Sequence, residues 1–314
     1  MDTKILIAVE NLYRYYGHHL AVDAISFELA QGEVLGFLGP NGAGKSTTMQ
    51  MITGNLAPSA GRIAINGIDL LDRPRLAKAE IGYLPEQPPV YPDLTVLEYL
   101  GYCTRLHRVS KGKRDQAVTR AMQRCGLDGV GKRLIGNLSK GYQQRVGIAQ
   151  AIVHNPAVVI LDEPTVGLDP NQIRDIRGLI RELGESHGII LSTHILPEVQ
   201  ATCTRVQIIH RGRLVFSESM QTLQQRLSGT SLVLETAAPL DTAILQQLPG
   251  IGSVEALGER RARVHFNDAN PAAAVAACVD THGWGLVELA LDRQTLEQVF
   301  VELTCSEVDA EAAA

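Results

Sequence analysis

Residues 39–46 read Gly-Pro-Asn-Gly-Ala-Gly-Lys-Ser and fit the pattern G-x-x-x-x-G-K-[ST] without a mismatch. The glycines permit backbone turns that a β-carbon would disfavour, so the N–H groups of the loop can point inward at phosphate oxygens. Lys45 supplies a positive charge for the β- and γ-phosphates, and the Ser46 hydroxyl is a suitable ligand for Mg²⁺. The stretch therefore predicts a nucleoside triphosphate site.

Two acids follow an apolar run and form a second candidate for chemistry. Residues 157–161 are all apolar, which predicts a buried parallel strand, and Asp162 and Glu163 follow at its carboxyl end. One acid can hold Mg²⁺ through water, and the next can polarise an attacking water. Another apolar strand, residues 188–193, ends at His194. This histidine either takes part in the chemistry beside the acids or packs in the core.

Two polar segments lie further from these motifs. Gln87 follows the expected strand 81–84, whose end is set by prolines, and carboxyl ends of strands are where α/β sheets bind ligands. Ser139 precedes an expected helix through Val153 and is predicted to cap it, with Gln143 helping to cap the first turn. Together with Gly141, Ser139 also suggests a second anion site, although the signal is weak on its own.

The elements that must position these residues follow from hydrophobic patterns. An apolar run at residues 34–38 predicts the strand before the glycine loop, and residues 47–52 predict the start of the helix after it. Alternating runs at residues 5–10 and 24–29 predict antiparallel strands, joined by a loop that carries the tyrosines at 13, 15 and 16. A tyrosine of that loop either stacks on a purine or packs against the sheet.

Composition limits the remaining choices. The chain has 314 residues, a length typical of about two domains, and its net charge of −5 argues against a nucleic-acid wrapper. Five scattered cysteines without a C-x-x-C pair favour a reducing compartment. No apolar stretch is long enough to span a bilayer, and no signal peptide is expected. The basic run 111–114 is typical of a solvated face, and its charge also suits, less strongly, a surface near anionic lipid.

The carboxyl-terminal third has a different pattern. After polar residues 217–228, the sequence predicts strands at 231–236, 253–257, 262–267 and 286–291, with helices at 241–248, 271–282 and 295–303. This order indicates a small α+β domain of ferredoxin-like type. We therefore expect an ATP-binding domain over residues 1–222, an accessory or regulatory domain over 229–304, and a disordered tail over 305–314.

Taken in order, the motifs resemble those of the ATP-binding subunits of ABC transporters. The set comprises the glycine loop, Gln87, the signature around Ser139, the acids, the Gly167-Leu168-Asp169 turn and His194. It covers about residues 5–222, and the wording of residues 138–145 and 162–170 is most similar to the bacterial ABC-2-type export branch. The resemblance implies an α/β P-loop NTPase fold with a mixed sheet core, an antiparallel β subdomain and a helical subdomain at about 90–155, followed by the small α+β domain.

The resemblance also implies a role for each part of the site. Tyr16 would stack on adenine, Glu163 would be the general base, and His194 would hold the γ-phosphate. Ser46, Gln87 and Asp162 would bind Mg²⁺, with Gln87 also sensing the γ-phosphate. The residues implied to bind the phosphates are Gly39, Asn41, Gly42, Gly44, Lys45, Ser46 and Thr47.

The family's mechanism requires a partner. Two subunits would face each other head to tail, with Ser139 and Gly141 of one copy contacting ATP bound to the other and Asp169 linking the two sites. Lys140 and Tyr142 stand where many relatives have glycine and glutamine, which affects the detail of these cross-interface contacts. The proline-rich loop after Gln87 and the helix from Leu94 are the candidate docking face for a permease.

The resemblance therefore implies an ATPase, using ATP and Mg²⁺, that powers membrane-spanning permease subunits on separate chains, in the direction of export. It would lie at the cytoplasmic side of the cell membrane and bind no nucleic acid. The alternative is a soluble ABC-type ATPase that acts on nucleic acid or the ribosome. A nucleotide-binding scaffold without turnover is a third possibility, against which Glu163 and His194 argue.

Overall fold

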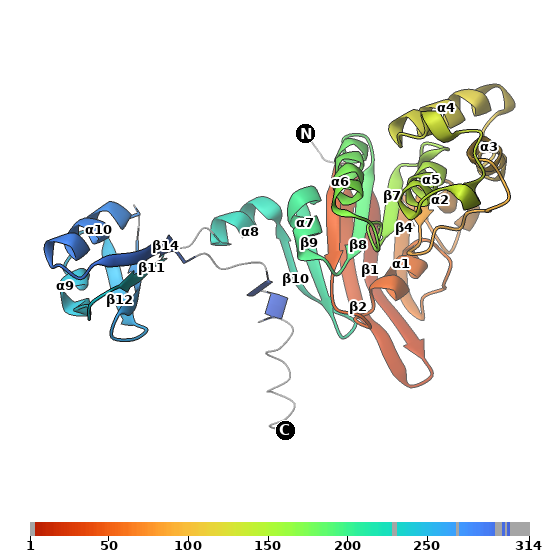
Figure 1. Ribbon diagram of the computed structural model, residues 1–314. Helices are drawn as coiled ribbons and strands as arrows, with labels where there is room; N and C mark the ends of the chain where they lie inside the picture. Colours follow the sequence, from red (N-terminus) through yellow and green to blue (C-terminus); the bar gives the residue numbers. More distant parts are fainter. Residues whose placement is uncertain (1–3, 228–230, 268–269, 293–296, 299, 302–314) are drawn as a thin grey trace. The chain divides into compact units, whose positions relative to one another are not determined.

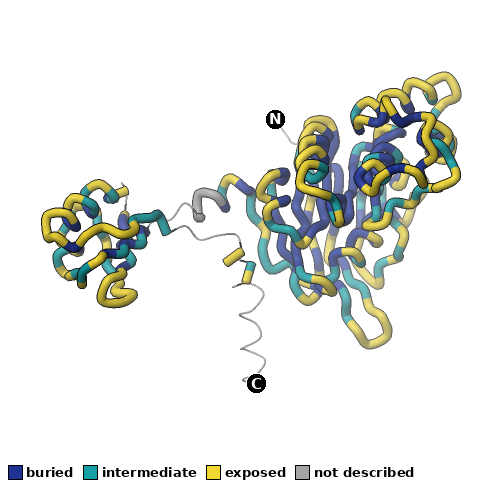
Figure 2. The backbone as a smooth tube through the Cα atoms, viewed as in Figure 1, coloured by how far each residue is buried: buried dark blue, intermediate teal, exposed yellow. Residues whose placement is uncertain are grey.

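The computed structural model describes residues 4–227, 231–267, 270–292, 297–298 and 300–301. The chain forms two compact units, Met1–Met220 and Gln221–Ala314. The boundary between them falls at the start of helix α8 (Met220–Leu227; Figure 1). Figure 2 shows that each unit has its own buried elements.

A six-stranded mixed sheet forms the centre of the first unit. Its order is β10-β9-β3-β8-β7-β6, and only the pairing of β10 with β9 is antiparallel among these described strands. Every residue of β3, β7 and β8 is buried, as expected for parallel strands covered on both faces. The strands are β3 (Val34–Leu38), β6 (Ile81–Leu84), β7 (Val158–Asp162), β8 (Gly188–Thr193), β9 (Arg205–His210) and β10 (Arg213–Ser219).

An antiparallel sheet of order β2-β1-β4-β5 covers one side of this centre. Side chains of this sheet, of α1 (Lys45–Ile52) and of the central strands share one hydrophobic core, which includes Phe27, Phe37 and Met49. The core fixes where α1 begins, and therefore where the glycine loop lies. The strands of this sheet are β1 (Ile5–Tyr16), β2 (His19–Ala30), β4 (Ala60–Ile65) and β5 (Ile68–Asp69).

The expectation of an aromatic loop between the first two strands was wrong. β1 continues to Tyr16 and β2 begins at His19, so the aromatic residues lie on a strand. The ladder persists because Tyr15 pairs with Leu20 and Tyr16 with His19, and the reversal needs only residues 17 and 18. Gly17 has φ of 58°, a left-handed value that suits glycine in a tight turn.

Helices complete the first unit. α3, α4 and α5 pack on one another within the predicted helical region, and a capping box between Thr95 and Glu98 begins α3. The basic run Lys111–Lys113 is an exposed 3₁₀ turn that leads into α4. The helices are α2 (Pro74–Ala79), α3 (Val96–Leu106), α4 (Arg114–Arg124), α5 (Lys140–Ile152), α6 (Pro170–Gly184) and α7 (Leu196–Thr202), with short 3₁₀ turns at Lys111–Lys113, Asp128–Val130 and Ile135–Asn137.

The second unit has the predicted order of elements. Its sheet is fully antiparallel, in the order β12-β13-β11-β14, which is the ferredoxin-like arrangement of a βαββαβ chain. Leu234, Phe266, Val279 and Trp284 belong to its separate core. The elements are β11 (Ser231–Thr236), α9 (Thr242–Gln246), β12 (Ile251–Ala256), β13 (Arg261–Phe266), α10 (Ala272–Thr281) and β14 (Leu286–Leu291). Most of the helix expected at 295–303, and the tail expected at 305–314, lie outside the described residues.

Candidate functional site

The glycine loop joins the end of β3 to the start of α1, as the sequence predicts. Gly42 and Gly44 have φ of 80° and 105°, so both use conformations that residues with a β-carbon rarely adopt. A β-carbon on Gly44 would also lie 2.7 Å from the carbonyl oxygen of Ala21. The loop can therefore curl against β2 only because this position is glycine.

Lys45 is the first residue of α1 and is held against the loop. Its Nζ donates to the carbonyl oxygens of Gly39 at 2.7 Å and Pro40 at 3.2 Å, and the residue is only 6% exposed. Burial lowers the pKa of Lys45, and the carboxylates of Glu163, Asp162 and Glu86 oppose that shift. The ammonium is thus held against the loop backbone, with three carboxylates near it.

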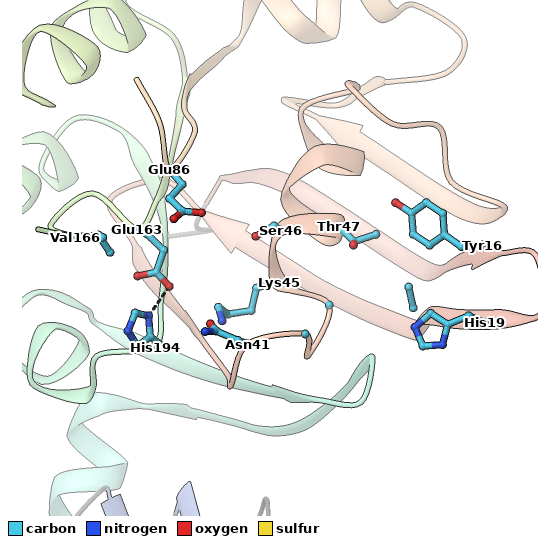
Figure 3. Close-up of a pocket in the computed structure, with 13 residues that line it drawn as sticks. Tyr16, His19, Asn41, Lys45, Ser46, Thr47, Glu86, Glu163, Val166 and His194 are labelled. Carbon is cyan, nitrogen blue, oxygen red and sulfur yellow. Dashed lines mark hydrogen bonds and ion pairs between the residues drawn. The ribbon is translucent and has the colours of Figure 1, made fainter. Parts of the chain in front are cut away.

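A cavity of about 380 Å³ opens above this loop (Figure 3), a size typical of small-ligand sites. It brings together most of the residues that the sequence indicates, although they come from five separate segments. The lining residues are Tyr16, His19, Ala21, Asn41, Gly42, Gly44, Lys45, Ser46, Thr47, Glu86, Glu163, Val166 and His194.

Tyr16 lines one end of the cavity. Tyr16 is 46% exposed, and the guanidinium carbon of Arg14 lies 4.7 Å from the centre of the tyrosine ring. The cation therefore covers one ring face, in a favourable cation–π contact. The other face can accept a flat aromatic ligand, while the phenol is held in place by β1.

The acids lie at the other end, after β7. Asp162 is 4% exposed, and its Oδ1 has no hydrogen-bond partner among the described residues. Burial raises the pKa of Asp162, and the nearby Ser192 and Ser46 hydroxyls and the Lys45 ammonium act in the opposite direction. Such an orphaned buried oxygen is costly unless a ligand satisfies it.

Glu163 is the acid that reaches the cavity wall. Its backbone has φ of 48°, and its N–H donates to the carbonyl oxygen of Ser192 at 2.9 Å. Its Oε1 lies 2.8 Å from Nδ1 of His194, and its Oε2 accepts from the Thr193 hydroxyl at 3.4 Å. The carboxylate therefore has a defined direction, as a general base requires.

A buried residue that the sequence analysis missed supports this pair. Glu198, on α7, is 1% exposed and accepts hydrogen bonds from the hydroxyls of Thr193, at 3.0 Å, and Thr165. Thr193 in turn accepts from the N–H of Ile195 at 3.1 Å. The signal that could have found Glu198 is an acid placed on the short segment directly after His194.

Gln87 does not line this cavity. The chain leaves β6 so that Glu86 reaches the cavity wall, whereas Gln87 lines a neighbouring cavity of about 490 Å³. That second cavity is also lined by Glu86, Pro88, Lys140, Gln143, Gln144 and Val166. Glu86, which the sequence analysis did not select, lines both cavities.

The signature residues also lie elsewhere on the unit. Ser139 is the exposed N-cap of α5 but makes no side-chain cap bond, and Gln143 donates to the carbonyls of Ile135 and Leu138, both at 3.2 Å. Ser139 is therefore the N-cap residue, as predicted, but without a side-chain cap bond. The predicted capping by Gln143 was wrong, because Gln143 turns back to the preceding segment. Ser139 lines a third cavity of about 430 Å³ with Arg133 and Tyr142.

Gly141 and Asp169 are structurally constrained. A β-carbon on Gly141 would lie 2.5 Å from the Gln172 side chain, so α5 and α6 approach closely at this point. Oδ1 of Asp169 accepts from the N–H groups of Asn171 and Gln172, both at 3.0 Å, and caps α6. Neither residue lines the cavity above the glycine loop.

Known proteins resemble this chain in sequence and in fold. The family described as "ABC transporter" matches residues 22–166. The ATP-binding protein YxlF and the linearmycin resistance ATP-binding protein LnrL, both of Bacillus subtilis (strain 168), are 32% and 30% identical. Each match covers 95% of this chain, with 99% of YxlF and 98% of LnrL. The bacitracin transport ATP-binding protein BcrA of Bacillus licheniformis is 36% identical over 70% of this chain and 72% of its own length.

Solved structures agree with this relationship. An ATP-binding subunit of an ABC transporter superposes with a TM-score of 0.64 at 31% identity, covering 70% of this chain and 92% of its own. The dimeric structure of the cassette MJ0796 superposes with a TM-score of 0.63 at 25% identity, covering 68% and 99%. These matches confirm the predicted fold class of an ABC ATPase.

Proposed function

This chain belongs to the ABC transporter family of ATP-binding proteins, and we propose that two copies of it close around ATP to drive a membrane-embedded permease. The chain is the ATP-binding and ATP-hydrolysing subunit of such a transporter. The observation that carries the proposal is the single cavity that holds the Lys45 loop at its base and the Glu163–His194 pair on its wall.

Different residues of the cavity take different roles in ATP binding and hydrolysis. The loop N–H groups and Lys45 bind the phosphates, and Tyr16 stacks on the base at the far end. Asn41, Gly42, Gly44 and Thr47 line the phosphate-binding part. Glu163 accepts a proton from the attacking water, and His194 orients that carboxylate and contacts the γ-phosphate.

The residues present fit a divalent cation beside the phosphates. The orphaned Oδ1 of Asp162 and the exposed Ser46 hydroxyl are oxygen ligands of the type that Mg²⁺ prefers. Among the described residues, no three His, Cys, Asp or Glu side chains form a metal cluster by themselves. This suits Mg²⁺, which usually binds one or two protein oxygens together with substrate phosphates and neutralises developing charge there.

A second copy completes the site. Ser139 and Gly141 lie away from the cavity of their own chain, so they are available to a nucleotide held by a partner. ATP carries dense negative charge and joins two half-sites, and loss of the γ-phosphate removes contacts and loosens them. The similar cassette MJ0796 forms a dimer, which supports this arrangement.

The permease is a separate polypeptide in this proposal. Among the described residues, the longest apolar helices fall short of a membrane span. The relatives named for bacitracin transport and linearmycin resistance support export. The subunit would then act at the cytoplasmic face of the membrane, with the loop at residues 85–95 and α3 contacting the permease.

Light scattering tests the pairing of two copies. The Glu163→Gln variant should dimerise when ATP and Mg²⁺ are added. Adding Lys45→Ala should abolish ATP binding and the dimer together. Adding Ser139→Arg should leave ATP binding to the monomer intact but prevent the dimer. A dimer that survives Ser139→Arg, or a closed pair with Ser139 far from the partner's γ-phosphate, would contradict the proposal.

A further inference from the structure

The segment that joins α3 to α4 carries positive charge without any acid. Residues 99–114 contain five lysines and arginines and no aspartate or glutamate, although the whole chain has a net charge of −5. Arg105, Arg108, Lys111 and Lys113 are all exposed. Within the part of the chain that the structure describes, none of these four side chains forms an ion pair. This surface, residues 105–113, is called the α3–α4 turn below.

Hydrogen bonds fix the shape of the α3–α4 turn. The N–H of Val109 donates to the carbonyl oxygen of Thr104 at 2.9 Å, and Nε of Arg114 donates to the carbonyl oxygen of Val109 at 2.9 Å. The N–H of Lys113 donates to the carbonyl oxygen of Ser110 at 2.8 Å. α3 and α4 also pack against each other, side by side at one edge of the first unit (Figure 1). The exposed cations are therefore held together on one ordered reversal of the chain.

Apolar and aromatic side chains adjoin the cations. Leu106, the last residue of α3, is 60% exposed, more than any other large hydrophobic residue described in the first unit. Tyr102 lies four residues earlier, on the same side of the helix. Its ring lies 5.8 Å from that of Tyr91, which is 51% exposed. Cations beside exposed leucine and tyrosine are typical of a surface that rests among lipid headgroups.

We propose that the α3–α4 turn binds the headgroups of anionic phospholipids, with Leu106 entering the boundary between headgroups and acyl chains. The cations attract the phosphates of the membrane surface, and the leucine leaves water as it enters the bilayer boundary. The inference goes beyond the proposed function, because the partner is the lipid surface itself and not the permease. The contact would hold the carboxyl end of α3 at the membrane surface, beside the permease that α3 is proposed to meet.

Two features favour lipid over nucleic acid as the partner. The exposed side chain of Leu106 gains nothing from a phosphate backbone, whereas a bilayer removes it from water. The basic surface is also bounded by two exposed acids, Glu98 and Asp115. A long polyanion that continued past the α3–α4 turn would therefore meet negative charge, whereas separate headgroups can gather at the cations alone.

Flotation of the full chain with lipid vesicles tests the proposal. One set of vesicles contains phosphatidylcholine alone, and the other also contains phosphatidylglycerol, which is anionic. Neither set contains a permease, so binding reports on the lipid alone. One variant carries three substitutions, Arg108→Gln, Lys111→Gln and Lys113→Gln, and a second carries Leu106→Gln.

A matched control removes the same amount of charge elsewhere on the first unit. It carries Arg73→Gln, Arg174→Gln and Arg181→Gln, all at exposed positions, and each of these arginines is followed or preceded directly by an acid in the sequence. The control therefore has the net charge of the α3–α4 triple variant but keeps the α3–α4 turn. A loss of vesicle binding that depends on net charge alone would appear equally in both triple variants.

Wild-type protein should float with the phosphatidylglycerol vesicles and not with the neutral ones. Binding should disappear in about 1 M salt, where the Debye length falls to about 3 Å. The α3–α4 triple variant should bind about 100-fold more weakly, because each cation near an anionic surface contributes about fivefold. Leu106→Gln should lose about tenfold through its lost apolar contact. The control triple variant should stay within about twofold of wild type, because its charges lie beyond the Debye length from the lipid.

Several results would overturn the proposal. These are a wild-type protein that does not float with phosphatidylglycerol vesicles, an equal loss in both triple variants, and a Leu106→Gln variant that binds as wild type does. A single-stranded RNA oligonucleotide that binds wild type more tightly than the vesicles do would assign the surface to nucleic acid instead. Circular dichroism melting of each variant verifies that these exposed substitutions leave the fold intact.

Nucleotide binding separates this proposal from the proposed function. The residues that line the cavity above the glycine loop lie outside residues 99–114, so every variant should bind ATP as wild type does. Wild-type protein that floats with anionic vesicles but does not bind ATP would contradict the proposed function alone. Wild-type protein that binds ATP but does not float would contradict the lipid contact alone.

Discussion

Nδ1 of His194 lies 2.8 Å from Oε1 of Glu163, although the two residues are 31 positions apart in the chain. The register of the central sheet fixes this distance, because β7 and β8 are parallel neighbours and Asp162 pairs with Ser192. Glu163 and His194 therefore leave the same edge of the sheet side by side. The carboxylate that we propose as the general base is therefore oriented by the pairing of two strands.

Replacing the general base should separate binding from turnover. Glu163→Gln keeps the size of the side chain, so ATP affinity should remain while the rate of hydrolysis falls by about 10²-fold or more, the scale of lost general-base catalysis. Phosphate release measured at saturating ATP tests this, with Glu185→Gln, an exposed acid outside the cavity, as the control. Full activity of Glu163→Gln would place the base elsewhere.

The aromatic end of the cavity should contribute to affinity through its ring alone. Tyr16→Ala should weaken ATP binding by about 1–3 kcal/mol, the range for base–aromatic stacking, whereas Tyr16→Phe should bind almost normally. Fluorescent nucleotide titration gives both affinities. Equal losses in the two variants would mean that the hydroxyl, and not the ring face opposite Arg14, makes the contact.

A methyl group on Gly44 should disrupt the loop. Gly44→Ala forces a β-carbon into a left-handed conformation and to within 2.7 Å of the Ala21 carbonyl oxygen. Backbone strain of this kind costs about 1–3 kcal/mol, so the loop should move and ATP affinity should fall. Gly178→Ala is the control, because nothing lies within 4 Å of its added β-carbon. Calorimetry that finds unchanged ATP affinity in Gly44→Ala would show that the loop tolerates the strain.

A buried histidine should make the first unit sensitive to acid. Burial first, and the ring of His107 second, lower the pKa of His154 to about 3. The two rings are stacked 3.7 Å apart, and Nε2–H of His154 donates to the Ile81 carbonyl. The unfolded chain therefore binds a proton at this position below about pH 6.5 when the folded chain does not, so stability is full above that pH and declines as pH falls toward 3.

Urea denaturation at pH 7.5 and pH 5.5 measures this effect. The decline can reach about 1.4 kcal/mol per pH unit below pH 6.5, so wild type should lose about 1 kcal/mol more than His154→Gln between these conditions. His18→Gln, at an exposed position, should behave as wild type. An identical pH dependence in His154→Gln and wild type would assign the acid sensitivity to other groups.

Removal of the second unit should test its proposed accessory role. The residues that form the cavity above the glycine loop belong to the first unit, and the second unit has its own core. A chain ending after Ser228 should therefore bind ATP unchanged, while dimerisation, measured by light scattering, and ATPase activity should fall. Unchanged dimerisation and turnover would remove the proposed role.

The sequence by itself determined the local parts of the site. Glycines at residues 42 and 44 encode the left-handed turns, and apolar runs encode the buried strands that end at Asp162 and Thr193. These features depend on a few adjacent residues, so a pattern in the chain is enough to predict them. The order of elements in the second unit was predictable for the same reason.

Only the tertiary structure decided which side chains line the cavity above the glycine loop. The loop after β6 directs Glu86 into the cavity and Gln87 away from it, and Glu198 supports Thr193 from another element. Arg14 covers one face of Tyr16 only because β1 continues past the predicted strand end. Side-chain direction outside regular strands depends on contacts between distant segments, and local periodicity does not encode those contacts.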